Sequence, residues 1–337
     1  MLRTSRRGFM ATAAAFASAP VLVGGCISSP ESRRVPRVGY LIGSTFPTLV
    51  AAFREELSKL GYVEGENLIL EMRQSRPNTA DGSIQAAELA AMDLDLIVAA
   101  ALPIAIEVRR HNPDMPMVIA TGPGLVSNGF ARSLQRPGGN TTGMEELPPG
   151  LTGKRLRLLK EVAPGVTHVA LLSTTPGRGG HEVQLAGAEE AAKALGVVVR
   201  SYRATSLAEL RDAIAAMTRD RIDGLVNFQG ALSLINRPLI IDFAEERRVP
   251  AVYQSRLFVE SGGLMSYAPD QEEQFRIAAR YVDRILKGTP PGDLPIQHPA
   301  RYFLTINSTA AASIGVALSS KVMALADHLV DAPRDRR

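Results

Sequence analysis

Residue types that catalyse reactions or bind metals are present in this chain, but their spacing matches no catalytic arrangement. The 337 residues contain no Gly-x-Ser-x-Gly motif, and Gly153-Lys154 lacks the context of a phosphate-binding loop, because Pro148 stands where the first glycine belongs. We expect the adjacent acids Glu145 and Glu146 to be solvated in a loop. The sequence therefore predicts a protein that is not an enzyme and that needs no cofactor or metal. No two of its histidines have the spacing of metal ligands: His111, His168, His181, His298 and His328.

Hydroxyl, amide and aromatic side chains gather where predicted strands end. Open α/β sheets bind ligands at the carboxyl ends of their strands. Groups of this kind orient a neutral or zwitterionic small molecule through hydrogen bonds and ring contacts. The alternative is that they only cap the helices that follow. The candidate ligand-binding residues are Ser44, Thr45, Phe46, Ala101, Thr121, Gly122, Thr174, Asn227, Gln229, Tyr253 and Tyr267.

Continuous apolar runs alternate with helical apolar spacing, and this order of elements occurs twice. Such runs are typical of parallel strands that helices cover on both faces. The repeat predicts an α/β fold with two Rossmann-like lobes, each built on a parallel sheet. In the first half, strands are expected at 38–42, 68–72, 94–99 and 117–120, and helices at 49–60, 84–92 and 104–111. In the second half, strands are expected at 168–172, 197–202, 223–227 and 250–253, and helices at 182–195, 207–217 and 237–247.

Three clusters rich in glycine and proline interrupt this pattern at 147–150, 261–263 and 288–292. Each can be a simple surface turn. Between two lobes, however, they can form a hinge of three crossovers, which makes both lobes discontinuous. We then expect an N-terminal lobe of residues 37–148 plus 262–289 and a C-terminal lobe of residues 150–261 plus 292–330.

The N-terminus has the features of an export signal. Arg6 and Arg7 lie in a Ser-Arg-Arg-x-Phe pattern, an apolar stretch follows to Val23, and small residues precede Cys26, the only cysteine. The apolar stretch is short for a membrane span. We expect residues 1–25 to be a twin-arginine signal peptide, Cys26 to be lipidated, and residues 26–36 to form a tether. Alternatively, cleavage near Ala19 releases a soluble protein with an incidental thiol.

The charge of the chain depends on this leader. Three of its 38 Lys and Arg residues lie there, so the remainder carries 35 against 34 Asp and Glu, and the net charge falls from +4 to +1. A nearly neutral composition indicates no basic face for nucleic acid. We therefore expect no nucleic-acid partner and an exported, periplasmic protein.

Four segments resemble a known family, the substrate-binding components of ABC transporters related to tryptophan and tyrosine uptake systems. The resemblance covers about Val35 to Asp327. It implies a type I periplasmic-binding fold, a small-molecule ligand held between two lobes, and a permease with its ATPase as partners. It also implies that Gly262 to Lys287 returns to the first lobe and that residues from Arg301 complete the second, ending in a helix at 321–330. The segments are 60–67 (LGYVEGEN), 136–143 (RPGGNTTG), 153–156 (GKRL) and 262–270 (GGLMSYAPD).

One position departs from the family pattern. Members commonly carry Gly-Asp-Pro after the fourth strand, where the aspartate can pair with a ligand amino group, but here Gly124 stands at the acidic position. An ammonium group there loses a charge-assisted partner. Arg178 or Arg256 could meet an anion, or both are solvated surface residues.

The first hypothesis is an extracytoplasmic lipoprotein that captures a small polar or aromatic solute for an ABC importer and is held at the membrane by its lipid. A ligand sensor that reports to a membrane receptor or kinase is the alternative. An enzyme on the same scaffold is disfavoured by the missing acid and base groups. A cytoplasmic repressor is excluded by the export leader and by the lack of a helix-turn-helix before Val35.

Overall fold

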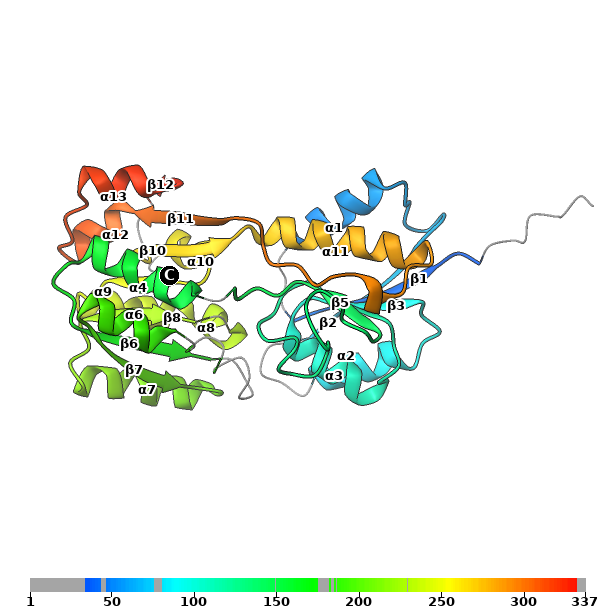
Figure 1. Ribbon diagram of the computed structural model, residues 1–337, viewed down its shortest axis with the longest axis horizontal. Helices are drawn as coiled ribbons and strands as arrows, with labels where there is room; N and C mark the ends of the chain where they lie inside the picture. The colour runs from blue at the N-terminus through cyan, green and yellow to red at the C-terminus, as the bar shows by residue number, and fades with distance from the viewer. Residues whose placement is uncertain are drawn as a thin grey trace, which may run out of the picture. The chain divides into compact units, whose positions relative to one another are not determined.

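The computed structural model of the chain describes residues 34–43, 47–75, 81–148, 150–174, 182, 185, 187–228 and 230–331. Val35–Arg337 is one unit and contains every element described below. Its strands form two sheets, and the elements that cover each sheet define two lobes (Figure 1).

The smaller lobe is built on a five-stranded parallel sheet with the order β2-β1-β3-β4-β5. The α1 and α11 helices pack side by side on one face of it (Figure 1). The α2 and α3 helices cover the other face. Its strands are β1 (Arg37–Ile42), β2 (Ile69–Gln74), β3 (Leu96–Ala99), β4 (Met117–Ile119) and β5 (Thr141–Gly143), and its helices are α1 (Pro47–Lys59), α2 (Asp81–Ala90), α3 (Leu102–His111) and α11 (Gln271–Leu286).

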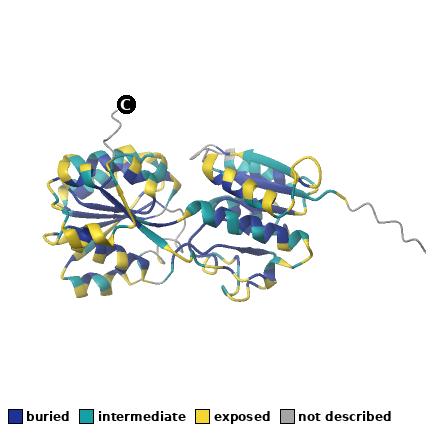
Figure 2. Ribbon diagram, turned by 90° about the horizontal axis from the view of Figure 1, so that it is seen from above, coloured by how far each residue is buried: buried dark blue, intermediate teal, exposed yellow. Residues whose placement is uncertain are grey.

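Alternate residues of each central strand serve the two faces of this sheet. Tyr40 packs with Phe53 of α1 and Phe275 of α11, whereas its neighbour Leu41 packs with α2 and α3. Because both faces are buried, apolar residues follow one another along the strand. Figure 2 shows the central strands as buried and the outer surfaces of the helices as exposed.

The larger lobe is built on a seven-stranded sheet with the order β12-β11-β10-β9-β8-β6-β7. All neighbours in it are parallel except the antiparallel pair β10 and β11. Its strands are β6 (His168–Ser173), β7 (Val198–Arg203), β8 (Gly224–Asn227), β9 (Ala251–Tyr253), β10 (Met265–Pro269), β11 (Tyr302–Asn307) and β12 (His328–Val330).

Helices cover both faces of this sheet as well. The α4 and α6 helices contribute to the core on one face, and α7, α9 and α10 contribute to the core on the other. The helices are α4 (Leu151–Val162), α6 (Ala188–Leu195), α7 (Leu207–Arg219), α8 (Ala231–Ile235), α9 (Arg237–Glu246), α10 (Arg256–Glu260), α12 (Ser308–Ser313) and α13 (Ser320–Leu325); a short 3₁₀ helix, Pro291–Asp293, lies beside β5 of the smaller lobe.

Side-chain caps begin several of these helices. Ser206 accepts a hydrogen bond from the Glu209 N–H at the start of α7, and Asp270 accepts one from the Glu273 N–H at the start of α11. Each cap satisfies a backbone donor that has no partner within the helix. The acidic side chains of Glu272 and Glu273 in the first turn of α11 also match the positive end of its dipole.

The predicted α/β class with two Rossmann-like lobes is confirmed, but the segments are shared out differently from the sequence expectation. The segment 262–289 divides: β10 pairs with β9 and β11 in the larger sheet, and only α11 joins the smaller lobe. Leu294 and Ile296 also pack in the smaller lobe, although 292–330 was expected in the other. The lobe that a segment joins is decided by its backbone hydrogen bonds to neighbouring strands, and local composition does not specify these bonds.

The chain therefore crosses between the lobes at three places: after β5, between β10 and α11, and between Ile296 and β11. The first lies at the predicted cluster 147–150. The cluster 261–263 instead precedes β10 within the larger lobe, and Gly292 packs against Gly139 within the smaller one.

The helix expected at 321–330 is also different. The α13 helix ends at Leu325, and β12 then pairs with β11. Asp327 accepts hydrogen bonds from the Leu304 N–H and from Arg301, which fastens this last strand to its neighbour. A helix continued through these residues could not make the Leu304 contact, so the tertiary partner overrides the local apolar spacing.

Candidate functional site

Six of the predicted ligand-binding residues lie at the carboxyl ends of strands in the two lobes. Ala101, Thr121 and Gly122 follow β3 and β4, and Thr174, Asn227 and Tyr253 lie at or after the ends of β6, β8 and β9. Outside the described residues lie Cys26, Ser44, Thr45, Phe46, Arg178 and Gln229.

Hydrogen bonds from Thr121 to the segment on either side of Ala101 hold these two strand ends together. The Thr121 hydroxyl donates to the Ala100 carbonyl at 3.0 Å, and the Thr121 carbonyl accepts from the Leu102 N–H at 3.1 Å. At Gly122 a Cβ atom would lie 2.7 Å from the Leu102 Cβ, so only glycine allows this close approach of the two strand ends. Adjacent parallel strands therefore bring these residues to one edge, as the sequence predicted.

Glu145 organises the loop that follows β4. Its carboxylate accepts the Gly124 N–H at 2.8 Å and the Leu125 N–H at 2.9 Å, and only 5% of the residue is exposed. Burial raises the pKa of this carboxyl, and the backbone hydrogen bonds oppose that rise. The expectation that Glu145 and Glu146 are solvated is wrong, because both are buried where the chain leaves the smaller lobe.

The same loop explains Gly124. Its φ is +73°, a left-handed backbone conformation that glycine adopts without strain. The Gly124 N–H already donates to the Glu145 carboxylate, so an acidic residue at this position would add a second carboxylate close to the first. Glycine at position 124 therefore suits this loop, in which the carboxylate comes from Glu145.

One row of polar side chains crosses the larger sheet. Tyr253, Ser266, Thr305 and His328 are paired in register on β9, β10, β11 and β12, so they share one face. Asn227 ends the neighbouring strand β8. This face is the one that α10 covers, through Phe258 stacked on the Tyr253 ring at 4.5 Å.

Several polar atoms on this face are buried and have no hydrogen-bond partner among the residues that the structure describes. They are both amide atoms of Asn227, the Tyr253 hydroxyl and the Ser266 hydroxyl. An unpaired buried polar atom is unfavourable by about 1–3 kcal/mol, so groups of this kind are expected where another molecule completes the bonding. The Tyr253 ring is itself fully buried, and burial raises the pKa of its hydroxyl. Thr174 differs, since its hydroxyl accepts the Ser233 N–H at 3.3 Å.

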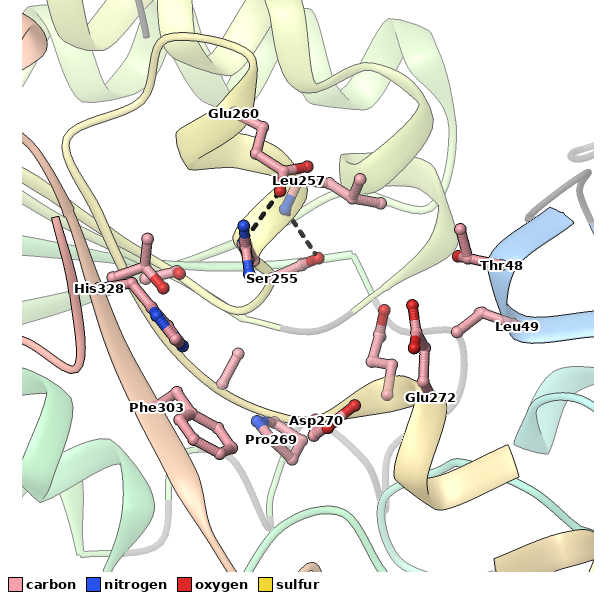
Figure 3. Close-up of a pocket in the computed structure, with 15 residues that line it drawn as sticks. Thr48, Leu49, Ser255, Leu257, Glu260, Pro269, Asp270, Glu272, Phe303 and His328 are labelled. Atoms are coloured by element: carbon pink, nitrogen blue, oxygen red, sulfur yellow. Dashed lines mark hydrogen bonds and ion pairs between the residues drawn. The ribbon is translucent and has the colours of Figure 1, made fainter. Parts of the chain in front are cut away.

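A cavity of about 450 Å³ lies beside this row and is lined by both lobes (Figure 3). Thr48 and Leu49 of α1 and Glu272 of α11 come from the smaller lobe, and α10, β10, β11 and β12 provide further walls. None of the seven predicted residues that the structure describes lines it, although Arg256, which the sequence analysis named as a possible partner for an anion, does so. Sequence reasoning missed Ser266 and Thr305, for which the available signal was a polar residue inside an otherwise apolar strand. It also missed Asp270, for which the signal was an N-cap residue between a strand and a helix.

Tyr267 lies close to this cavity but faces the crossovers. Its ring stacks on Tyr302 at 5.6 Å, and its carbonyl accepts two hydrogen bonds from the buried Arg155 guanidinium, at 3.0 and 3.2 Å. The Tyr302 hydroxyl donates to the Glu146 carbonyl at 2.7 Å, and His298 Nδ1 lies 2.8 Å from the Glu145 carbonyl. These contacts join the three crossover segments to one another.

Two further properties bear on the chemistry. Among the described residues, no three His, Cys, Asp or Glu side chains are grouped so that they could hold a metal ion. None of the helices that the structure describes is both long and apolar enough to span a bilayer.

Two α/β lobes on parallel sheets, joined by three crossovers and enclosing a cavity, define the type I periplasmic-binding fold. The model of the family "ABC transporter substrate binding protein" matches residues 43–330. The chain belongs to this family of substrate-binding proteins.

Individual relatives agree with this assignment. A tyrosine-binding protein of Clostridioides difficile is 23% identical over 269 residues, which cover 79% of this chain and 77% of the relative. The structure of an ABC domain from Streptococcus pneumonia in complex with L-Trp has a TM-score of 0.81 at 21% identity and covers 88% of this chain and 99% of that one. A ligand-free, open substrate-binding protein with adhesive properties from Clostridium difficile has a TM-score of 0.66 at 22% identity, with 89% and 100% covered. At these identities the structural likeness establishes the fold.

Proposed function

We propose that this protein is the extracytoplasmic solute-binding component of an ABC importer. It captures a small polar or aromatic solute between its lobes and delivers it to a membrane permease that works with an ATPase. The observation that carries this proposal is the 450 Å³ cavity, which residues of both lobes line and which adjoins buried polar atoms without partners. A cavity of this size accommodates a metabolite.

The mechanism is capture by closure. A ligand that touches both lobes binds the closed arrangement more tightly than the open one, so it shifts the population toward the closed form. The crossover contacts made by Arg155, Tyr267 and Tyr302 keep the connecting segments ordered during this motion. The permease then recognises the closed form.

The proposed location rests on the N-terminal leader. The twin-arginine pattern directs export, and lipidation of Cys26 holds the protein at the membrane through the residues that follow. A tether of this kind raises the effective concentration of the binder near its permease.

The relatives suggest the first ligands to test, namely L-tryptophan and L-tyrosine. The remaining candidate site residues, including Ser44, Thr45, Phe46 and Gln229, are proposed to complete the cleft. Substitution of Asn227 by alanine should then weaken ligand binding.

The test is native mass spectrometry of the protein purified gently from its native host, followed by calorimetry with the ligand so identified. We expect one small molecule per protein and a loss of its uptake in a deletion strain. A protein that carries no ligand and binds no metabolite in a broad screen would overturn the proposal. Binding without any uptake defect would instead favour the sensor alternative.

A further inference from the structure

The buried carboxylate of Glu145 lies where the carboxyl edge of the smaller sheet meets the crossovers. We infer that Glu145 is a positioning residue. Its ionised carboxylate holds the β4 loop, residues 122–130, in the arrangement that captures the solute, and uptake of a proton by this carboxylate loosens the loop and weakens capture. This inference rests on the proposed function, because it assigns a pH dependence to the same cleft.

The carboxylate of Glu145 binds the β4 loop directly. Its Oε1 accepts the Gly124 N–H at 2.8 Å, and its Oε2 accepts the Leu125 N–H at 2.9 Å. An ionised carboxylate accepts hydrogen bonds at both oxygens, whereas the protonated acid carries an O–H donor on one of them. Because both oxygens already face backbone donors, uptake of a proton weakens at least one of these two hydrogen bonds.

The backbone of Glu145 is fixed independently of its side chain. Its N–H donates to the Gln297 carbonyl at 2.9 Å, and its carbonyl oxygen lies 2.8 Å from His298 Nδ1. Both partners precede β11 in the third crossover, whereas Glu145 itself lies in the first. Protonation of the carboxyl therefore changes the hold on the β4 loop without releasing Glu145 from the crossovers.

The far end of the β4 loop is held by a different charge. Arg109 of α3 donates to the carbonyls of Asn128 and Gly129, each at 2.9 Å, and its guanidinium lies 3.7 Å from the centre of the Phe130 ring. Arginine stays charged over the whole range in which a carboxyl group titrates. Loss of the Glu145 hydrogen bonds therefore loosens the first part of the loop, next to β4, and leaves its far end in place.

The part of the loop that loosens lies where a solute is expected. Open α/β sheets bind ligands at the carboxyl ends of their strands, and this loop begins with the candidate residue Gly122 directly after β4. Val126, in the same segment, leaves 40% of its surface exposed. If only the ordered loop completes the wall of the cleft, the apparent dissociation constant rises as the ordered fraction falls.

The surroundings of Glu145 set the direction of the pH dependence. Burial raises the pKa of its carboxyl above the ordinary value of 4.5, and the loop hydrogen bonds and the charge of His298 oppose this rise. Arg155 of α4 lies in the field of the neighbouring Glu146. Affinity should therefore be retained above the pKa of Glu145 and lost as the pH falls through it. The titratable groups that face Glu145 are His298 of the third crossover, Tyr302 of β11 and Glu146 of the first crossover.

The first experiment needs no ligand. In the ¹⁵N-labelled protein, the backbone amide resonances of Gly124 and Leu125 should shift together between about pH 7.5 and 4, with one midpoint above 4.5, because their shared acceptor titrates. Glu145→Gln, whose amide offers one acceptor and one donor as the protonated acid does, should abolish the shift. His298→Gln should leave it in place, which separates the carboxyl from the imidazole. Glu55→Gln, an exposed site on α1, is the matched control and should also leave it unchanged.

The second experiment measures the affinity for L-tryptophan and L-tyrosine by isothermal titration calorimetry over the same pH range. The unaltered protein should lose at least about threefold in affinity on acidification, and Glu145→Gln should bind about as weakly at every pH as the acidified protein does.

The inference is overturned if the Gly124 and Leu125 amides do not titrate, or if their titration survives Glu145→Gln. It is also overturned if this variant keeps the affinity and the pH profile of the unaltered protein, because Glu145 then has only a structural role. Binding of neither amino acid would count against the proposed function, and the amide titration would then decide the inference by itself.

Discussion

Replacement of Arg155 by methionine tests how the crossover segments are held. Arg155 is 2% exposed and is the largest fully buried side chain of the described residues. Its guanidinium donates two hydrogen bonds to the Tyr267 carbonyl and lies in the field of Glu146. Methionine keeps an unbranched side chain of similar length but removes the charge and all five donors.

The expected magnitude is a balance of two effects. Loss of two hydrogen bonds from a charged group is unfavourable by about 1.5–3 kcal/mol each. Burial lowers the pKa of Arg155 to about 10 from 12.5, which corresponds to about 3 kcal/mol of desolvation that the variant no longer bears. The buried Glu146 also loses its neighbouring cation. We therefore expect Arg155→Met to lower the free energy of unfolding by about 2 kcal/mol.

Urea denaturation followed by circular dichroism measures this difference. Arg157→Met, an exposed site on the same helix, is the control and should change the unfolding free energy by less than about 0.5 kcal/mol. A double-mutant cycle with Glu146→Gln should give a coupling of at least about 0.5 kcal/mol. If Arg155→Met is as stable as the unaltered protein and shows no coupling to Glu146, the guanidinium does not hold these segments and our reasoning fails.

Three further predictions concern other parts of the chain. Gly143→Ala should lower the unfolding free energy by at least about 2 kcal/mol, because its Cβ would lie 2.1 Å from the Ile119 carbonyl oxygen. The control Gly139→Ala should be nearly neutral, because a Cβ there has no atom within 4 Å. Equal melting temperatures of the two variants would contradict this prediction. Burial raises the pKa of Glu145, so the folded state holds the proton of this carboxyl more tightly than the unfolded chain does. The unfolding free energy of the protein relative to that of Glu145→Gln should therefore fall as the pH rises from 4 to 7. A difference between the two proteins that stays constant over this pH range in urea titrations would refute the prediction. Cys26→Ser should move the protein from the membrane fraction to the soluble fraction, or block its processing, without changing ligand affinity. If immunoblots find the variant still in the membrane fraction, Cys26 is not the site of lipidation.

Local pattern was sufficient for most of the regular elements. The buried strands near residues 38, 96, 168 and 225 were predicted because both faces of a parallel sheet demand continuous apolar runs. The helix predicted to end at residue 195 does end there, before Gly196, which adopts the left-handed conformation with φ of 64°. The α/β class and its repeat followed from these signals.

The shorter strands were harder, because their identity depends on partners that lie far away in the chain. In β12, His328 pairs with Thr305, and the segment is a strand only because β11 offers an edge beside it. Likewise β10 joins the larger sheet through β9 and β11, although the residues after it return to the smaller lobe. Three to five residues carry too weak a pattern to specify such membership.

The candidate site also has some features that the sequence predicted and others that only the structure revealed. From residue types alone, the chain showed polar groups at strand ends and no set of catalytic residues, which indicated a binder rather than an enzyme. The burial of Glu145 and the place of Asp270 in the lining of the cavity were invisible at that stage, because both depend on which segments face one another.

The sequence by itself was enough to predict the repeated α/β order, the polar residues at strand ends and a leader, since each of these predictions depends only on local composition and spacing. The tertiary structure alone decided where the lobes exchange segments and which residues line the cavity. It also decided that the Ser266 hydroxyl is buried with no partner among the described residues. The physical reason is that hydrogen-bond satisfaction and charge balance belong to groups brought together from distant parts of the chain, and no window of neighbouring residues contains both partners.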